Sequence, residues 1–251
     1  MPLMSDRPMS VSLRLVSLNV ERSRHIDLVL PFLRSQSSDV VCLQELLEAD
    51  VPTISEALGA TCDFIPMARH IGEESPQIFG VGIFSKLPVR DRGVLFYRGD
   101  PARIPELDQS DEKTYNNKNF PLVWCDVEKE GALFRIATTH FTWTPDGQAD
   151  DDQRRDMKEL LRILESKGEF VLCGDFNAPR GGEIFGMLAQ KYTDNIPLRY
   201  TTSIDGTLHR DGHIPVMVDG LFSTPGYAVS DVELIPGISD HYALIATVKE
   251  I

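Results

Sequence analysis

Short apolar runs recur along the whole chain, each bounded by glycine, proline, asparagine or aspartate. This pattern is typical of β-strands, which we expect at residues 13–19, 39–45, 80–86, 120–128, 133–141, 170–177, 217–224, 229–235 and 241–249. Helical spacing is confined to residues 24–34, 52–58, 152–166 and 181–191. Because strands outnumber helices, we predict an α/β protein in which two sheets pack face to face and helices lie outside.

Two polar segments interrupt this pattern. Residues 146–156 are rich in aspartate and precede the clearest helical stripe, so we interpret them as a solvated loop that opens a helix with carboxylates in its first turn. Residues 99–119 carry two prolines and show no periodicity, which predicts a long loop. Loops of that length are often disordered or part of a functional site.

At 251 residues the chain has room for one large core, and we expect residues 1–251 to form a single domain with a flexible stretch at 1–10. No signal peptide or apolar span is recognisable, so we expect a cytoplasmic protein without a membrane anchor. The four cysteines include no CxxC pair, and Cys42, Cys125 and Cys173 lie inside apolar runs. We interpret them as buried, reduced thiols, with disulfides or a zinc site as the minor alternative.

The formal net charge of −13 argues against a protein that wraps nucleic acid non-specifically, because such binding depends on many Lys and Arg contacts to phosphates. A phosphate substrate is still compatible with this charge. Carboxylates near a phosphate would need a divalent cation between them, and a local rim of basic residues would help.

Several predicted strands begin or end next to an acid, an amide or a histidine. These residues are Asn19, Glu45, His140, Asp175, Asn177, Asp219, Asp240 and His241. Each alone has an ordinary explanation, as a turn former, a helix cap or a buried histidine. Charged residues seldom finish a buried strand without a partner, however, and one shared site would satisfy all of them.

This set is rich in oxygen. Glu45, Asp175 and Asp240 carry carboxylates, Asn19 and Asn177 carry amides, and the set contains no thiolate. Hard oxygen ligands indicate Mg²⁺ or Mn²⁺, and Mg²⁺ normally uses only one or two protein carboxylates. The remaining carboxylates would then handle protons. A metal, an acid that orients water and a histidine near the phosphate are the parts of metal-assisted phosphate ester hydrolysis.

At these residues the chain resembles the endonuclease/exonuclease/phosphatase superfamily, which includes deoxyribonucleases, abasic-site endonucleases, tyrosyl-DNA phosphodiesterases, neutral sphingomyelinases and inositol polyphosphate phosphatases. The motifs that carry the resemblance are, in order, SLNV (17–20), CLQE (42–45), TTHF (138–141), CGDFN (173–177), VDGLF (218–222) and ISDHYAL (238–244). The resemblance implies a four-layer α/β sandwich, with two packed mixed β-sheets flanked by helices. It also implies one catalytic domain whose active site lies at the edge where the sheets meet.

The resemblance assigns metal binding and water activation position by position. Glu45 would be the principal ligand of Mg²⁺ or Mn²⁺, with Asn19 supporting the metal or Glu45, and Asp240 near a second ligand position. Asp175 would orient or deprotonate the attacking water, or protonate the leaving oxygen. Asn177 would donate its amide to that nucleophile or to the transition state.

The resemblance assigns the histidines to the phosphate. His241 would contact the scissile phosphate, held in tautomer and orientation by Asp219. His140 matches the histidine that deoxyribonucleases and sphingomyelinases use to stabilise the phosphate or to donate a proton. With Asn177, these histidines form the expected contacts to the substrate phosphate.

Three positions depart from the family pattern or stay open. Many relatives carry an aromatic residue where Gly220 stands, which would leave the wall near Asp219 open or differently packed. Glu21 falls where some nucleases hold a second metal, and the alternative is a surface loop acid. For Gln44, the alternative to a functional role is a hydrogen bond to the neighbouring backbone.

The substrate stays open between hypotheses of different classes. The first is a nuclease or DNA-end-processing phosphodiesterase, with candidate contacts at Arg103, Lys113, Tyr115, Asn116, Asn117, Lys118, Arg180, His209, Arg210 and His213. The second is a phosphodiesterase or phosphatase for a small or lipid phosphate, favoured by the acidic charge. The third is a catalytically silent binding module, which predicts losses among the expected catalytic positions, and none is lost. The oligomeric state also stays open.

Overall fold

The computed structural model describes residues 11–71, 76–108 and 110–251. The strands of the first sheet are β1 (Ser12–Asn19), β2 (Val40–Leu47), β3 (Thr61–Ile71), β4 (Gln77–Ser85), β6 (Glu106–Asp108), β12 (Tyr227–Ile235) and β13 (Ala243–Glu250). Those of the second are β5 (Val89–Arg98), β7 (Phe120–Lys129), β8 (Ala132–His140), β9 (Val171–Asp175), β10 (Thr193–Asp194) and β11 (Asp219–Ser223). The helices are α1 (Ile26–Ser35), α2 (Val51–Leu58), α3 (Asp151–Glu165) and α4 (Glu183–Ala189), with short 3-10 turns η1 (Glu21–Ser23), η2 (Glu48–Asp50) and η3 (Glu112–Thr114).

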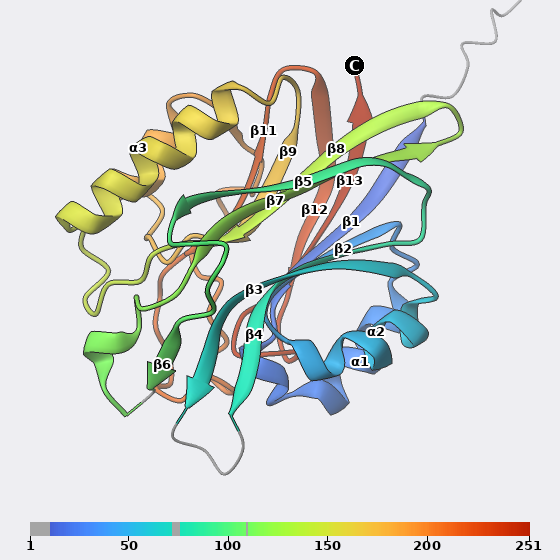
Figure 1. Ribbon diagram of the computed structural model, residues 1–251. Coiled ribbons are helices and arrows are strands. Elements are labelled where there is room, and N and C mark those ends of the chain that lie inside the picture. Colours follow the sequence, from blue (N-terminus) through green and yellow to red (C-terminus); the bar gives the residue numbers. More distant parts are fainter. Residues whose placement is uncertain (1–10, 72–75, 109) are drawn as a thin grey trace, which may run out of the picture.

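The two sheets pack face to face, and Figure 1 shows α1 and α2 outside one sheet and α3 outside the other. The strand order is β12-β13-β1-β2-β4-β3-β6 in the first sheet and β10-β11-β9-β8-β7-β5 in the second. Each sheet contains both parallel and antiparallel pairs, such as β1 with β2 and β1 with β13 in the first. The expected sandwich of two mixed sheets is therefore confirmed. The stretch 1–10, expected to be flexible, lies outside the described residues.

Strand β1 lies between two layers of the apolar core. One lies between the sheets and contains Leu13 and Leu15 of β1, and the other lies under α1 and α2 and contains Val16 and Leu18 of the same strand. Successive side chains of a strand point to opposite faces, so β1 supplies both layers. The neighbouring strand β2 does the same with its continuous apolar run VVCL, which is typical of a sheet that is covered on both sides.

All the expected strands and helices are present, but the strands β3, β5, β6 and β10 were not anticipated. Strand β5, with the sequence VRDRGVLFYR, forms the edge of the second sheet. Its first half carries exposed charged side chains, so the apolar run that marks the strand is confined to its second half, VLFY. Residues 99–119, expected as a long loop, contain β6 and η3. β6 pairs with only three residues of β3, which is too short a segment to produce a periodic pattern.

Helix α3 begins as the acidic segment predicts. The side chain of Asp150 accepts a hydrogen bond from the backbone N–H of Gln153 and caps the helix, and Asp151 and Asp152 lie in the first turn. All four cysteines are free, and Cys42, Cys125 and Cys173 are buried, so the interpretation as reduced thiols is confirmed. None of the helices in the described part of the chain is long and apolar enough to cross a membrane.

Candidate active site

The space between the sheets changes from apolar to polar toward one edge of the sandwich. Four strands run toward that edge, and on each of them the side chains that face the other sheet become polar in that direction. In order, these side chains are Leu15, Ser17 and Asn19 on β1, Cys42 and Gln44 on β2, Ile136, Thr138 and His140 on β8, and Val171, Cys173 and Asp175 on β9. Because same-face residues are two apart, each strand delivers its last polar side chain to the same edge. The strand ends therefore meet as the sequence predicts.

Gln44 connects the two sheets directly below this edge. Its Nε2 donates to Oγ of Ser17 at 3.3 Å and to Oγ1 of Thr138 at 3.0 Å, and the side chain is fully buried. These partners are side chains on β1 and β8, and not the neighbouring backbone that was the alternative to a functional role. Gln44 therefore joins the two sheets directly beneath the polar side chains of the site.

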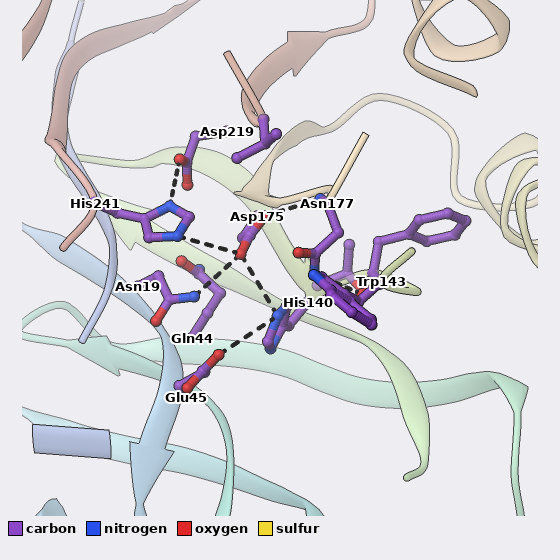
Figure 2. A network of polar contacts seen from close by, with 12 residues as sticks. Asn19, Gln44, Glu45, His140, Trp143, Asp175, Asn177, Asp219 and His241 are labelled. Carbon is purple, nitrogen blue, oxygen red and sulfur yellow. Dashed lines mark hydrogen bonds and ion pairs between the residues drawn. The ribbon is translucent and has the colours of Figure 1, made fainter. Parts of the chain in front are cut away.

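Asp175 lies at the centre of the polar cluster, as Figure 2 shows. Its Oδ2 accepts a hydrogen bond from Nδ2 of Asn19 at 3.1 Å and lies 3.5 Å from Nε2 of His140 and 3.8 Å from Nε2 of His241. Its Oδ1 accepts from the backbone N–H of Asn177 at 2.8 Å. With 1% of the residue exposed, the carboxylate has one orientation, which the surrounding N–H groups fix.

The partners of Asn19 fix which way its amide points. Nδ2 donates to Asp175, and Oδ1 accepts from the backbone N–H of Glu21 at 3.0 Å, so a flipped amide would lose both bonds. Asn19 was expected to support the metal or Glu45. In the structure its N–H contacts Asp175 and its oxygen contacts the backbone of Glu21, and the role at the metal stays a prediction.

His241 and Asp219 form a close pair. Nδ1 of His241 lies 2.7 Å from Oδ2 of Asp219, and both residues are buried. Burial lowers the pKa of His241, but Asp219 and Asp175 raise it more, so that it lies well above its ordinary value. His241 is therefore positively charged at neutral pH, with Nε2 directed at Asp175.

His140 has the opposite character. Burial and the nearby Lys118 lower the pKa of His140 to about 4, despite the opposing effect of Asp175 and Glu45. Its Nε2 lies 3.5 Å from Oδ2 of Asp175 and 3.9 Å from Oε1 of Glu45, and its Nδ1 has no hydrogen-bond partner within the described structure. The site thus combines a neutral and a charged imidazole, which is how one pocket serves different proton-transfer tasks.

Glu45 reaches the site through a β-bulge. The register between β2 and β4 shifts between Leu43 and Leu46, and Glu45 adopts a φ of 51° there. Bulges of this kind redirect a side chain out of the regular alternation. Burial raises the pKa of Glu45, but Arg22, His140 and Lys118 lower it more, to about 2.

The carboxylates of Glu21, Glu45 and Asp240 line one cavity. Burial raises the pKa of Asp240 to about 7, with His241 opposing and Glu45 and Glu21 adding to the rise. Glu21 is 7% exposed and is therefore not a surface loop acid. Three carboxylates that repel one another in a buried cavity, beside the amide of Asn19, form a set of hard oxygen donors that suits a divalent cation.

A second group of possible metal ligands lies next to these carboxylates. Asp175, Asp219 and His241 present ligand atoms within 4.8 Å of one another, which is consistent with a metal site. His241 already shares a close hydrogen bond with Asp219, however, and its charged form cannot ligate a metal. The chemistry of the donors therefore favours the group around Glu45.

Asn177 and Gly220 shape the walls. Nδ2 of Asn177 donates to the carbonyl of Phe141 at 2.9 Å, so one of its two N–H bonds is not available to a substrate. The wall at Gly220 is closed, because a Cβ there would lie 2.7 Å from the rings of both Phe176 and Phe222. The aromatic residue expected after Asp219 is thus replaced by rings from neighbouring positions.

The cavity of about 150 Å³ at the site extends beyond the predicted residues. The other residues that line it are Arg22, Phe79, Leu107, Tyr115, Lys118, Trp143, His209 and Arg210. Tyr115, Lys118, His209 and Arg210 were among the candidate substrate contacts, whereas the rest of that set does not line the cavity. Arg22 and Trp143 were missed, although both lie within three residues of a motif residue, Arg22 after Asn19 and Trp143 after His140.

Comparison with known proteins agrees with this geometry. The subunit Ccr4 of the Aspergillus oryzae CCR4-Not complex, a 3′-5′ exoribonuclease, is 26% identical over 223 residues, which are 80% of this chain and only 28% of that protein's length. An endonuclease/exonuclease/phosphatase from Bacteroides vulgatus has a TM-score of 0.70 at 18% identity, covering 96% of this chain and 100% of the other. The mannosyl-6-phosphatase Bt3783 of Bacteroides thetaiotaomicron has a TM-score of 0.66 at 13% identity, covering 95% and 99%.

The family assignment rests on a match that runs through nearly the whole site. The model of the endonuclease/exonuclease/phosphatase family matches residues 16–241, from the strand that carries Asn19 to His241 itself. This range is most of the chain and includes all of the residues described above as the polar cluster. The chain therefore belongs to the endonuclease/exonuclease/phosphatase family of phosphoesterases.

Proposed function

We propose that this protein is a divalent-metal-dependent phosphodiester hydrolase. The observation that carries the proposal is the position of Asp175, whose Oδ2 lies 3.1, 3.5 and 3.8 Å from nitrogens of Asn19, His140 and His241. A buried carboxylate held in this way keeps its orientation and is suited to orient a water molecule and take its proton. The attack of that water on phosphorus is the first step of ester hydrolysis.

The residues around Asp175 have complementary tasks in this proposal. His241, charged and oriented by Asp219 at 2.7 Å, contacts the non-bridging oxygens of the phosphate and offsets the negative charge that grows on them. Neutral His140 offers an N–H to the same group, and the remaining N–H of Asn177 reaches the nucleophile or the transition state. Preorganised donors of this kind supply much of the rate enhancement in such sites.

The expected cofactor is Mg²⁺ or Mn²⁺. Glu45 would be its principal ligand, and Asp240 and the Asn19 amide lie in the same cavity. When bound, such a cation polarises a phosphoryl oxygen and neutralises charge. It would also offset the repulsion from Glu45 and Glu21, which adds to the effect of burial in raising the pKa of Asp240 to about 7.

For the substrate we propose a nucleic acid, cleaved at or near an end. The ring centroids of Tyr115 and Trp143 lie 5.0 Å apart on one wall of the cavity. The Asn116 side chain fixes the backbone of Trp143, because its Nδ2 donates to the Trp143 carbonyl and its Oδ1 accepts from the Trp143 N–H. An aromatic wall beside a phosphate site is suited to stack a base, and Arg210 at the rim is suited to a backbone phosphate. The likeness to Ccr4, a 3′-5′ exoribonuclease, supports this choice.

A small phosphate ester is the second candidate. The cavity of about 150 Å³ and the net charge of −13 favour it over a long duplex, and the mannosyl-6-phosphatase has the same fold. A catalytically silent module finds no support, because the expected catalytic side chains are all present and converge at one edge of the sandwich.

The reaction class is tested with bis-p-nitrophenyl phosphate. We expect hydrolysis with Mg²⁺ or Mn²⁺ that EDTA abolishes and that Asp175→Asn lowers by about 10²-fold or more. Asp231→Asn, an exposed aspartate on β12, is the matched control and should leave the rate unchanged. Equal activity in Asp175→Asn and wild type would refute the proposal.

The substrate class is tested by comparing the hydrolysis of oligonucleotides with that of small phosphate esters. We expect single-stranded oligonucleotides to be shortened from one end with a higher kcat/KM than bis-p-nitrophenyl phosphate or sugar phosphates. Trp143→Ala should raise KM for the oligonucleotide and leave the small ester unaffected, because only the oligonucleotide has a base to stack. No turnover of any oligonucleotide at low salt would favour the small ester instead.

A further inference from the structure

The turn that follows β1 is left-handed at three successive residues. Glu21, Arg22 and Ser23 have φ angles of 43°, 51° and 64°, and none of them is glycine. Residues with a Cβ rarely adopt this conformation even singly, because the Cβ crowds the neighbouring carbonyl. Three in succession persist only where the surrounding structure holds them, and such strain is concentrated at functional sites.

The surrounding structure does hold this turn, chiefly through Glu21. Its backbone N–H donates to Oδ1 of Asn19 at 3.0 Å, and its carboxylate pairs with Arg24 at 2.7 Å and His25 at 3.2 Å. Glu21 is thus tied to the end of β1 on one side and to the start of α1 on the other. The residue between these anchors, Arg22, is therefore presented in a fixed direction.

That direction is into the cavity. Nε of Arg22 lies 3.3 Å from Oε2 of Glu45, and the side chain is only 16% exposed, whereas that of Arg24 in the same turn is 54% exposed. Within the described residues, Glu45 is the one ion-pair partner of Arg22, and its Nε makes no hydrogen bond. A guanidinium carries five N–H donors in a planar fork that matches phosphate, so most of this group remains available to an anion in the cavity.

We propose that Arg22 is a phosphate-binding residue. The left-handed turn holds its guanidinium beside Glu45, where it donates hydrogen bonds to a non-bridging oxygen of the substrate phosphate. The inference rests on the proposed function for the identity of the substrate but not for the binding of phosphate. Arg22 shares Glu45 with the expected cation, so the two positive charges repel each other while both attract the phosphate. Its removal should therefore weaken phosphate binding without weakening cation binding.

The test uses Arg22→Gly, because glycine adopts a φ of 51° without strain and the variant should fold. We expect its Tm to equal or exceed that of wild type, and its Kd for Mn²⁺ in calorimetry to be equal or lower. The Kd of the Mn²⁺-loaded protein for inorganic phosphate should rise about tenfold or more, and kcat/KM for bis-p-nitrophenyl phosphate should fall about 10²-fold. Arg162→Ala, an exposed arginine on α3, removes the same charge far from the site and should change neither constant.

Two results would overturn the inference. One is phosphate binding by Arg22→Gly at the wild-type level. The other is a joint loss of Mn²⁺ affinity and Tm, which would mean that Arg22 only supports the position of Glu45. If wild type hydrolyses no phosphodiester at all, the proposed function fails, but the comparison of phosphate affinities between wild type and Arg22→Gly still decides the role of Arg22.

Discussion

Nδ1 of His241 lies 2.7 Å from Oδ2 of Asp219, and the pair joins the segment before β13 to the start of β11. Asp219 thus holds the ring so that Nε2, rather than Nδ1, faces Asp175 at 3.8 Å. The same contact raises the pKa of His241 and keeps the imidazole charged. One carboxylate therefore sets both the orientation and the charge of the residue expected to meet the phosphate.

The first prediction concerns Asp219→Asn. Without the carboxylate, the pKa of His241 falls back toward its ordinary value of 6.5, since the largest cause that raises it is lost. A charged His241 exists only below its pKa, so the variant should lose activity at a lower pH than wild type as pH rises. We expect the alkaline limb of the kcat/KM profile to shift to lower pH and the rate at pH 8 to fall about 10²-fold. An alkaline limb at the wild-type position would contradict this assignment.

The second prediction concerns the metal-free protein. Burial raises the pKa of Asp240 from 3.8 to about 7, so between these values the folded protein keeps a proton that the unfolded chain has lost. The contribution of Asp240 to stability is therefore greatest below pH 3.8 and is lost as pH rises to 7. Asp240→Asn removes this loss, and in EDTA it should raise the free energy of unfolding at pH 8 by on the order of 2 kcal/mol.

Urea titrations of wild type and Asp240→Asn at several pH values check this prediction. The difference between the two proteins should shrink toward zero at pH 4, where Asp240 is protonated in the folded state. Asp240→Asn should also bind Mn²⁺ more weakly than wild type, because it removes a carboxylate from the cavity. A stability difference that does not depend on pH would rule out the titration of Asp240 as its cause.

The third prediction concerns Lys118, which lies in the segment expected as a loop. It is 8% exposed, lines the cavity, and has no carboxylate within ion-pair distance among the described residues. Burial lowers the pKa of Lys118, although Glu45 and Asp175 oppose the effect. The folded protein therefore holds this charge at a cost, which a phosphate in the cavity would offset.

Lys118→Met should therefore have opposite effects on stability and on activity. We expect the free energy of unfolding of the metal-free protein to rise by about 1 kcal/mol, and kcat/KM to fall about 10- to 10²-fold. Lys113→Met, an exposed lysine of the same segment, is the control for the loss of charge and should alter neither quantity. A variant that is less stable and fully active would indicate that Lys118 has only a structural role.

The sequence predicted the centre of the site better than its walls, and there is a physical reason for the difference. Asp175 and Asn19 were found because the side chains on one face of a strand are two residues apart. On both strands these side chains change from apolar to polar toward the strand's end, and this change can be recognised in the sequence alone. Arg22 was missed because nothing in its neighbours reveals three left-handed residues in succession. Trp143 was missed because its position depends on Asn116, which lies 27 residues away in the sequence.

The same distinction explains the edges of the fold. Strands covered on both faces, such as β2 with its run VVCL, produce continuous apolar runs, whereas β5 at a sheet edge carries charges on its exposed positions. The packing around Gly220 also depends on side chains that the sequence alone does not place next to it. The sequence left two alternatives, an open wall or a differently packed one, and the rings of Phe176 and Phe222 fill the space, which agrees with the second.

The last prediction concerns Gly174, which precedes Asp175 on β9. Gly174 has a φ of 145°, and a Cβ there would lie 2.1 Å from the carbonyl oxygen of Thr139 on the paired strand β8. Neither strand can move away without displacing Asp175 or His140, which end the same two strands. We therefore expect Gly174→Ala to lower the free energy of unfolding by roughly 2–4 kcal/mol. We also expect its activity to fall by more than the loss of folded protein explains.

Gly186→Ala is the matched control, because Gly186 lies in α4 and a Cβ added there would have nothing within 4 Å. This variant should raise the free energy of unfolding by about 1 kcal/mol. Urea unfolding and kcat of both variants decide the matter: a Gly174→Ala protein as stable and active as wild type would mean that the close approach of β8 and β9 is not what positions Asp175.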